Sequence, residues 1–285
     1  MDTPEHLVQV LQGEAERLTQ YLQTLPPDAW HHPSACDLWE VRDVVGHLTW
    51  VSARFYGTVS RALRGDSTPP TGAPPVGTST MAGRQAFIAR EAIALRERLG
   101  EQLLPTFCAE MDQFLTCLGQ LRPHEWERPA YSALRVVPLR HYPFVTLAEV
   151  ALHTWDIRSR LAPAVRLSPE SVSALVQQLP PRLAWGGPDG AALRQGADLA
   201  LPGRYRWEVI QVVPRRYDIV GEDGSYRIVR ASEATADVTF RGAAETFVLM
   251  LYGRLTLESA MATGRLRTEG EPGRVAAFAR WLTGA

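Results

Sequence analysis

Residues 146–160 read TLAEVALHTWDIRSR, and this stretch decides how the N-terminal half of the chain is interpreted. Glu149 and His153 lie four residues apart and Asp156 follows three residues later, so a helix carries all three on one face. Their neighbours are largely apolar, and polar side chains beside a buried stripe must be paired, hydrogen-bonded or bound to a cation. Glutamate and histidine at this spacing can ligate one metal ion from a single helix. The alternative is an ordinary contact between neighbouring side chains on a helix surface.

A third metal ligand should come from another helix, and His47 is the best candidate. It lies in the segment DVVGHL, residues 43–48, at the edge of an apolar stripe. Two imidazoles and one carboxylate suit Zn²⁺ and leave a coordination position open for catalysis, although Fe²⁺ accepts the same donors. A hydrogen-bonded helix histidine is the alternative interpretation of His47. The other histidines lie near termini or predicted loops and are weaker candidates: His6, His31, His32, His124 and His141.

Helices with one-sided apolar stripes are predicted for the first 160 residues, at about 4–25, 37–63, 83–121 and 146–161. Asp37 and Glu40 are expected to form the capping box of the second helix. Pro105 should kink or break the third. Residues 65–79 are too rich in proline and glycine for a helix or a central strand. Because such stripes can be buried only against one another, the pattern predicts a four-helix bundle.

The pattern changes after Pro163, where a short helix at about 168–178 precedes alternating apolar and polar residues. This alternation predicts strands around 205–209, 226–228 and 238–240, with a hairpin turn at 221–224. A helix at about 243–261, a short strand at about 265–269 and a helix at about 273–283 follow. The predicted fold class is therefore α plus α+β. A metal-binding helical bundle occupies residues 1–165, and a smaller α+β domain occupies residues 180–285.

Composition excludes several classes of protein. The chain has 285 residues, 45% of them hydrophobic, and a net charge of −1, which is typical of a globular protein. The balanced charge gives no support for a nucleic-acid partner. No run of about 20 apolar residues or signal-peptide pattern is visible, so no membrane partner is expected. Three cysteines are too few for a disulfide framework, and we expect a cytoplasmic protein that acts on small molecules.

Residues 30–48 read WHHPSACDLWEVRDVVGHL. This segment resembles the signature of the mycothiol-dependent maleylpyruvate isomerase family, which are DinB-like four-helix metalloproteins. Glu149 and His153 match the second motif of that family, so the resemblance implies that His47, Glu149 and His153 bind zinc. Residues 236–255 resemble the second domain of the family, which is similar to sterol carrier protein 2. Leu38 and Glu40 depart from the glycine and threonine that are usual in the signature.

The resemblance implies a zinc-dependent enzyme that uses a low-molecular-weight thiol, mycothiol, as a nucleophile on an electrophilic small molecule. Cis–trans isomerisation, as of maleylpyruvate, results if the thiol is eliminated again, and a thiol S-transferase results if the adduct is released. Arg254 matches an arginine that faces the metal from the second domain of the isomerase, which implies a catalytic role. A surface arginine at the end of a helix is the alternative for Arg254.

Two residues near the predicted ligands have open roles. Asp156 can orient His153 or form an ion pair with Arg160, and the ion pair is the preferred interpretation. Cys36 is interpreted first as a structural thiol. A non-catalytic alternative for the whole protein is a C-terminal domain that binds an apolar ligand. The residues on which it rests are Phe240, Phe247, Leu249 and Leu251. The substrate, the thiol, the choice among zinc, iron and nickel, and the oligomeric state are left open by the sequence.

Overall fold

The computed structural model describes residues 2–36, 38–78, 81–162, 165–177, 202–211, 214–222 and 225–283. The chain divides into two compact units, Met1–Ser171 and Val172–Ala285. The helices of the N-terminal unit are α1 (Pro4–Thr24), α2 (Val41–Leu63), α3 (Met81–Leu99), α4 (Leu103–Gly119) and α5 (His141–Leu161), and α6 (Pro169–Val176) follows. Short 3-10 helices are η1 (Pro27–His31), η2 (Gly100–Gln102) and η3 (Pro123–Glu127), and β1 (Pro129–Ala130) pairs with β2 (Val137–Pro138).

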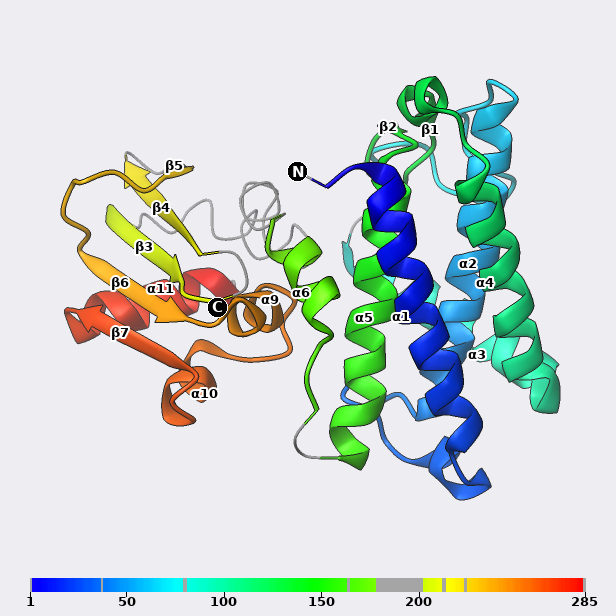
Figure 1. Cartoon of the computed structure of the whole chain (residues 1–285), viewed down its shortest axis with the longest axis horizontal. Coiled ribbons are helices and arrows are strands. Elements are labelled where there is room, and N and C mark those ends of the chain that lie inside the picture. The colour runs from blue at the N-terminus through cyan, green and yellow to red at the C-terminus, as the bar shows by residue number, and fades with distance from the viewer. Residues whose placement is uncertain are drawn as a thin grey trace. The chain divides into compact units, whose positions relative to one another are not determined.

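Four helices of the N-terminal unit form a bundle around one apolar core. α1 contacts α4 and α5, and α2 contacts the same two helices from the other side, while α3 packs outside the bundle on α2 (Figure 1). The predicted stripes form this core because residues three and four apart share a helix face. Fully buried examples are Leu11, Leu18, Val44, Phe107 and Phe114.

The crossing of α3 over α2 is unusually close at Gly46. A Cβ atom at this position would lie 2.9 Å from the carbonyl oxygen of Ala92 and 3.0 Å from Cβ of Arg96. One turn earlier, Arg96 Nε donates a hydrogen bond of 2.9 Å to Asp43 Oδ1. α3 is therefore held against α2 directly beside His47.

Three predicted helix boundaries are wrong, each for a local reason. α2 begins at Val41 with Glu40 as its N-cap, whose N–H donates to Asp43 Oδ2 at 2.9 Å, and the expected cap Asp37 lies outside the described residues. α5 begins at His141, five residues before the predicted start, because a proline in the first turn leaves no required hydrogen bond unmade. The long helix at 83–121 breaks at Gly100, where φ is +50°, and Pro105 lies in the first turn of α4.

The C-terminal unit contains a mixed sheet in the order β5-β4-β3-β6-β7. Its strands are β3 (Gly203–Val209), β4 (Arg215–Glu222), β5 (Ser225–Arg230), β6 (Val238–Gly242) and β7 (Leu266–Gly270). β3 and β6 are parallel, and the other neighbours are antiparallel. Its helices are α9 (Ala244–Leu251), α10 (Leu257–Ala262) and α11 (Pro272–Thr283). The fold class predicted from the sequence, helices followed by an α+β domain, is confirmed.

Aromatic residues join α9 and α11 to one face of this sheet. The rings of Trp207 and Phe247 lie 4.8 Å apart, and Phe278 of α11 lies 5.0 Å from Tyr205 and 4.7 Å from Phe240. All five are 2% exposed or less. The alternation along β3 and β6 produces this contact because every second residue of a strand faces the same side.

Two features of the C-terminal unit differ from the prediction. The helix expected at 243–261 is two helices, because Gly253 adopts a φ of +70° and Thr256 then caps α10 by accepting the N–H of Ser259. β4 was not predicted, since its buried residues do not alternate cleanly with polar ones. The buried run includes Asp218, whose charge is paired with Arg206.

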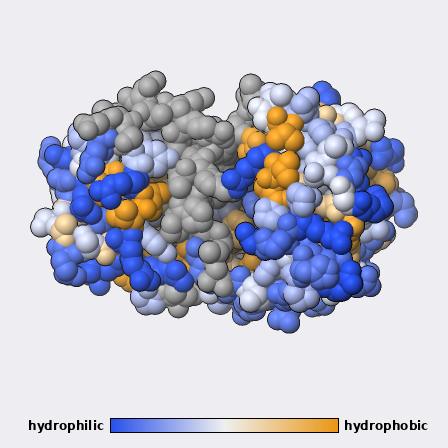
Figure 2. Space-filling model, turned by 90° about the horizontal axis from the view of Figure 1, so that it is seen from above, coloured by the Kyte–Doolittle hydropathy of each residue, from blue (hydrophilic) through white to orange (hydrophobic). Residues whose placement is uncertain are grey.

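The surface visible in Figure 2 is dominated by hydrophilic side chains, and the hydrophobic ones form smaller patches. Among the described residues, no helix has the length and apolar character needed to cross a membrane.

Candidate metal centre

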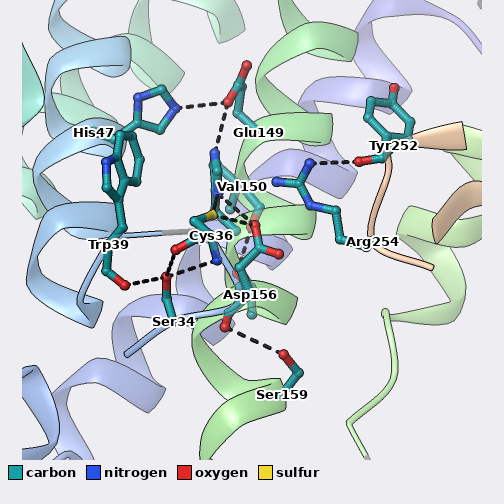
Figure 3. A network of polar contacts seen from close by, with 12 residues as sticks. Ser34, Cys36, Trp39, His47, Glu149, Val150, Asp156, Ser159, Tyr252 and Arg254 are labelled. Atoms are coloured by element: carbon teal, nitrogen blue, oxygen red, sulfur yellow. Dashed lines mark hydrogen bonds and ion pairs between the residues drawn. The ribbon is translucent and has the colours of Figure 1, made fainter. Parts of the chain in front are cut away.

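The three predicted ligands come together between α2 and α5. His47 Nε2 lies 3.0 Å from Glu149 Oε2, and His153 Nε2 lies 3.3 Å from the same oxygen. The two imidazole rings are 4.8 Å apart, edge to face. His47 and His153 are buried, whereas the side chain of Glu149 is 32% exposed. Figure 3 shows the carboxylate of Glu149 pointing toward the ring of His47. Two buried imidazoles and one partly exposed carboxylate thus form the site.

Helical spacing explains how α5 supplies two donors. Glu149 and His153 are one turn apart, and their side chains meet because residues at i and i+4 share a face. The third donor comes from α2, which contacts α5 in the bundle.

Asp156 and Cys36 surround the other ring nitrogen of His153. Asp156 Oδ2 lies 2.9 Å from His153 Nδ1, and Asp156 is completely buried. Cys36 Sγ donates a hydrogen bond of 3.1 Å to the same carboxylate and lies 3.5 Å from His153 Nδ1 (Figure 3). Because a carboxylate only accepts, Asp156 favours a proton on Nδ1 of His153, so Nε2, which faces Glu149, is the nitrogen that a metal ion would bind in place of a proton. Asp156 therefore positions His153, which was the less favoured of its two interpretations from the sequence. Cys36, interpreted first as a structural thiol, contacts both Asp156 and His153.

A turn before α2 holds Cys36 in place. The N–H of Ala35 donates to the carbonyl oxygen of Asp156 at 2.9 Å, and Ser34 Oγ donates to the carbonyl oxygen of Trp39 at 2.9 Å. Trp39 leaves this turn with its ring 5.3 Å from His47 and 6.4 Å from His153. The half-buried indole therefore covers one side of the site.

Burial and hydrogen bonding oppose each other in the pKa values of the site. Burial would raise the pKa of Glu149, but hydrogen bonds from His153 and His47 lower it well below its usual value. Burial would lower the pKa of His153, but its hydrogen bonds with Asp156, Cys36 and Glu149 raise it well above its usual value. Glu149 is therefore a carboxylate at neutral pH, and the negative charges around His153 favour a cation at this position.

Sequence comparison identifies the N-terminal unit. Residues 11–158 match the profile of the mycothiol maleylpyruvate isomerase N-terminal domain, which is more than half of the chain. The chain belongs to this family. Residues 197–283 match the SCP-2 sterol transfer family. No curated protein sequence matches the chain.

Two crystal structures of the mycothiol-dependent maleylpyruvate isomerase share the fold of this family member. One is of a histidine-to-alanine mutant, with 12% sequence identity and a TM-score of 0.59, and the other has 14% identity and a TM-score of 0.58. Each match covers 95% of this chain and 97% of the other. At these identities the likeness concerns the fold alone.

The donors of this mycothiol maleylpyruvate isomerase family member fit a zinc ion. Nitrogen and oxygen ligands at zinc-binding distance in a tetrahedral site are about 3.3 Å apart. The observed separations of 3.0 and 3.3 Å agree with that value, and the three ligand atoms all lie within 4.8 Å of one another. The Nδ1 contact of His153 with Asp156 is the contact that ligating histidines usually make. His47, Glu149 and His153 can therefore hold a divalent metal.

The remaining predicted residues belong to other elements of the structure. Arg254 belongs to the C-terminal unit, in the turn between α9 and α10, where its Nη1 donates to the carbonyl oxygen of Tyr252 at 2.8 Å (Figure 3). The other five histidines are exposed or half-buried at the ends of helices or in turns: His6, His31, His32, His124 and His141.

Proposed function

We propose that this protein is a zinc-dependent enzyme that uses a low-molecular-weight thiol, mycothiol, as its nucleophile, and that it isomerises a small molecule like maleylpyruvate. One observation carries the proposal: two buried imidazoles and a partly exposed carboxylate converge, and Asp156 fixes the ligating nitrogen of His153. Three protein donors leave a position open on the metal, which is the arrangement of catalytic zinc sites.

Zinc at this site would supply the positive charge that keeps a bound thiol deprotonated at neutral pH, where a free thiol of pKa about 8.5 is mostly protonated. The chain's own residues have three tasks. His47, Glu149 and His153 hold the ion, Asp156 maintains the tautomer of His153, and the indole of Trp39 limits access of water.

In the proposed isomerisation, the thiolate adds to one carbon of a cis double bond that is conjugated to a carbonyl group. The electron pair of the double bond moves onto the conjugated system, the remaining single bond rotates, and elimination restores both the double bond, now trans, and the thiolate. If the adduct instead takes up a proton and leaves, the same site is a mycothiol S-transferase. Product analysis separates these outcomes, because only the S-transferase consumes the thiol.

The proposal includes Arg254 as a cationic group for a substrate carboxylate, because a guanidinium binds a carboxylate through two parallel hydrogen bonds. Arg254→Gln should then raise KM for an anionic substrate, whereas the amount of bound zinc should change little. The alternative, a module that binds an apolar ligand, is less favoured. Its residues Phe240, Phe247 and Leu249 are completely buried in the core of the C-terminal unit.

The test is a metal analysis of the purified protein and of two histidine variants. His153→Ala should lose both bound zinc and turnover, whereas His124→Ala, which changes an exposed histidine, should keep both. A His153→Ala protein that retains stoichiometric zinc and full activity would refute the metal site. If wild-type protein holds zinc but does not bind mycothiol, the metal site stands and the isomerase function does not.

A further inference from the structure

Arg54 lies on the same face of α2 as the proposed ligand His47. Seven residues separate them, which is about two turns at 3.6 residues per turn, so their directions around the helix differ by only about 20°. Arg54 is half-buried, and it is a residue for which the proposed chemistry has no task so far.

The side chain of Arg54 bends back along α2, toward the level of His47 on the helix axis. Its guanidinium carbon lies 5.1 Å from the ring centroid of Trp50, four residues earlier in α2. Trp50 in turn packs edge to face against Phe87 of α3 at 6.0 Å, which limits its movement. The guanidinium is therefore held about one helical turn, on the order of 5 Å along the axis, from the level of His47.

α5, which carries Glu149 and His153, also lies beside α2 at the level of Arg54. Phe55, the next residue, lies 5.2 Å from the ring of Tyr142 on α5, two turns before Glu149. Burial raises the pKa of Tyr142, and the charge of Arg54 acts on it in the opposite direction. His47 and Arg54 thus share a face of α2, and α5 passes beside this helix at the levels of both residues.

The other arginines of α2 have carboxylate partners. Arg42 Nε lies 2.6 Å from Glu40 Oε2, and Arg61 Nη2 lies 2.6 Å from Asp66 Oδ2. Among the described residues, no carboxylate forms an ion pair with Arg54, whose guanidinium instead stacks on an aromatic ring. A half-buried guanidinium with this environment is suited to an anion from outside the chain.

We propose that Arg54 binds a carboxylate of the substrate while the reacting part of the substrate lies at the His47–Glu149–His153 site. This inference rests on the proposed function and names its substrate class: a small carboxylic acid whose carboxylate lies about one helical turn from the reacting atoms. Trp50 pre-orients the guanidinium, so Arg54 is a specificity-determining residue.

The test compares the binding of succinate and butyrate to zinc-loaded protein by calorimetry. Both acids have four carbons, but only succinate can reach the metal and Arg54 together. Wild-type protein should bind succinate more tightly than butyrate. Arg54→Gln should weaken succinate binding roughly 10- to 100-fold and leave butyrate binding unchanged, because one charge-assisted contact is lost.

Arg158→Gln is the matched control, since the guanidinium of Arg158 also lies 5.1 Å from an aromatic ring, that of Tyr21. It should bind both acids as wild-type protein does. A melting temperature of the Arg54→Gln protein near that of wild-type protein verifies its folding. If this variant does not fold, it is replaced by Arg54→Lys, which keeps the charge. That variant should retain part of the preference for succinate.

Unchanged succinate affinity in a folded, zinc-loaded Arg54→Gln protein would overturn the proposal. Zinc content is measured in the same samples, so a failure of the proposed function is recognised separately as absence of the metal. In that case the titration is repeated on metal-free protein. Arg54→Gln must still weaken succinate binding there, and equal affinities would overturn the role of Arg54.

Discussion

Replacing Asp156 with asparagine should weaken zinc binding without removing a ligand. Asp156 Oδ2 is 2.9 Å from His153 Nδ1 and 3.1 Å from Cys36 Sγ, and the residue is completely buried. Asparagine keeps the shape but loses the charge, and its amide can donate to Nδ1, which would place the proton of His153 on Nε2. Loss of such a contact reduces metal affinity by about 10- to 100-fold. This corresponds to about 1.4 to 2.8 kcal/mol.

The assay is competition for zinc between the protein and a chromophoric chelator. Asp112→Asn on α4 is the control, because Asp112 is exposed and should leave the affinity unchanged. Melting of the metal-free proteins is measured in parallel, so that a loss of folding is not mistaken for a loss of positioning. An Asp156→Asn protein that folds normally and binds zinc within twofold of wild type would show that Asp156 does not position His153.

The remaining predictions concern stability. Gly46→Ala should destabilise the protein by about 1 kcal/mol, because overpacking outweighs the higher helix propensity of alanine. Gly57→Ala on the same helix should stabilise the protein by up to about 1 kcal/mol, because the space around a Cβ there is open. Denaturant titration in which both variants change the free energy of unfolding with the same sign would contradict this. Asp218→Asn should destabilise the C-terminal unit by about 3 kcal/mol at pH 7, because Arg206 loses its buried partner. Burial would raise the pKa of Asp218 but hydrogen bonds from Arg206 lower it overall, so this contribution is present above pH 3.8 and is lost as the pH falls through the folded pKa. A wild-type advantage that persists at lower pH would contradict the pairing. Finally, chelation of zinc present at 100 times its Kd should remove about 2.7 kcal/mol of stability; a melting temperature that does not fall would show that no ion was bound.

Helical periodicity is a local property, and it was sufficient to predict that Glu149 and His153 lie side by side in the cluster that also contains His47. Glu149 and His153 share a face in any helix, and the apolar residues around them require a partner helix. His47 could be selected because the other histidines lie near termini or predicted loops. The four-helix bundle and the strands with regular alternation followed from the same kind of pattern.

Contacts between residues far apart in the sequence could not be predicted from local patterns. Cys36 reaches Asp156 across 120 positions, in a turn whose course depends on hydrogen bonds with α5. For Asp156, local spacing offered both His153 and Arg160 as partners, and only burial in the folded bundle favours the histidine. The break at Gly253 was missed for a different reason, since a glycine inside an apolar run is compatible with a helix until its φ is known.

The separation of the ligands along the chain has a consequence for biosynthesis. His47 and Glu149 are 102 positions apart, so the site does not exist in any short fragment of the protein. A nascent chain that has reached α4 contains only one of the three proposed ligands, His47, and one monodentate donor retains a metal poorly. A metal ion at the proposed site would therefore bind only after the bundle has closed, late in the folding of this unit. Its presence would thus report that α5 has docked on α2.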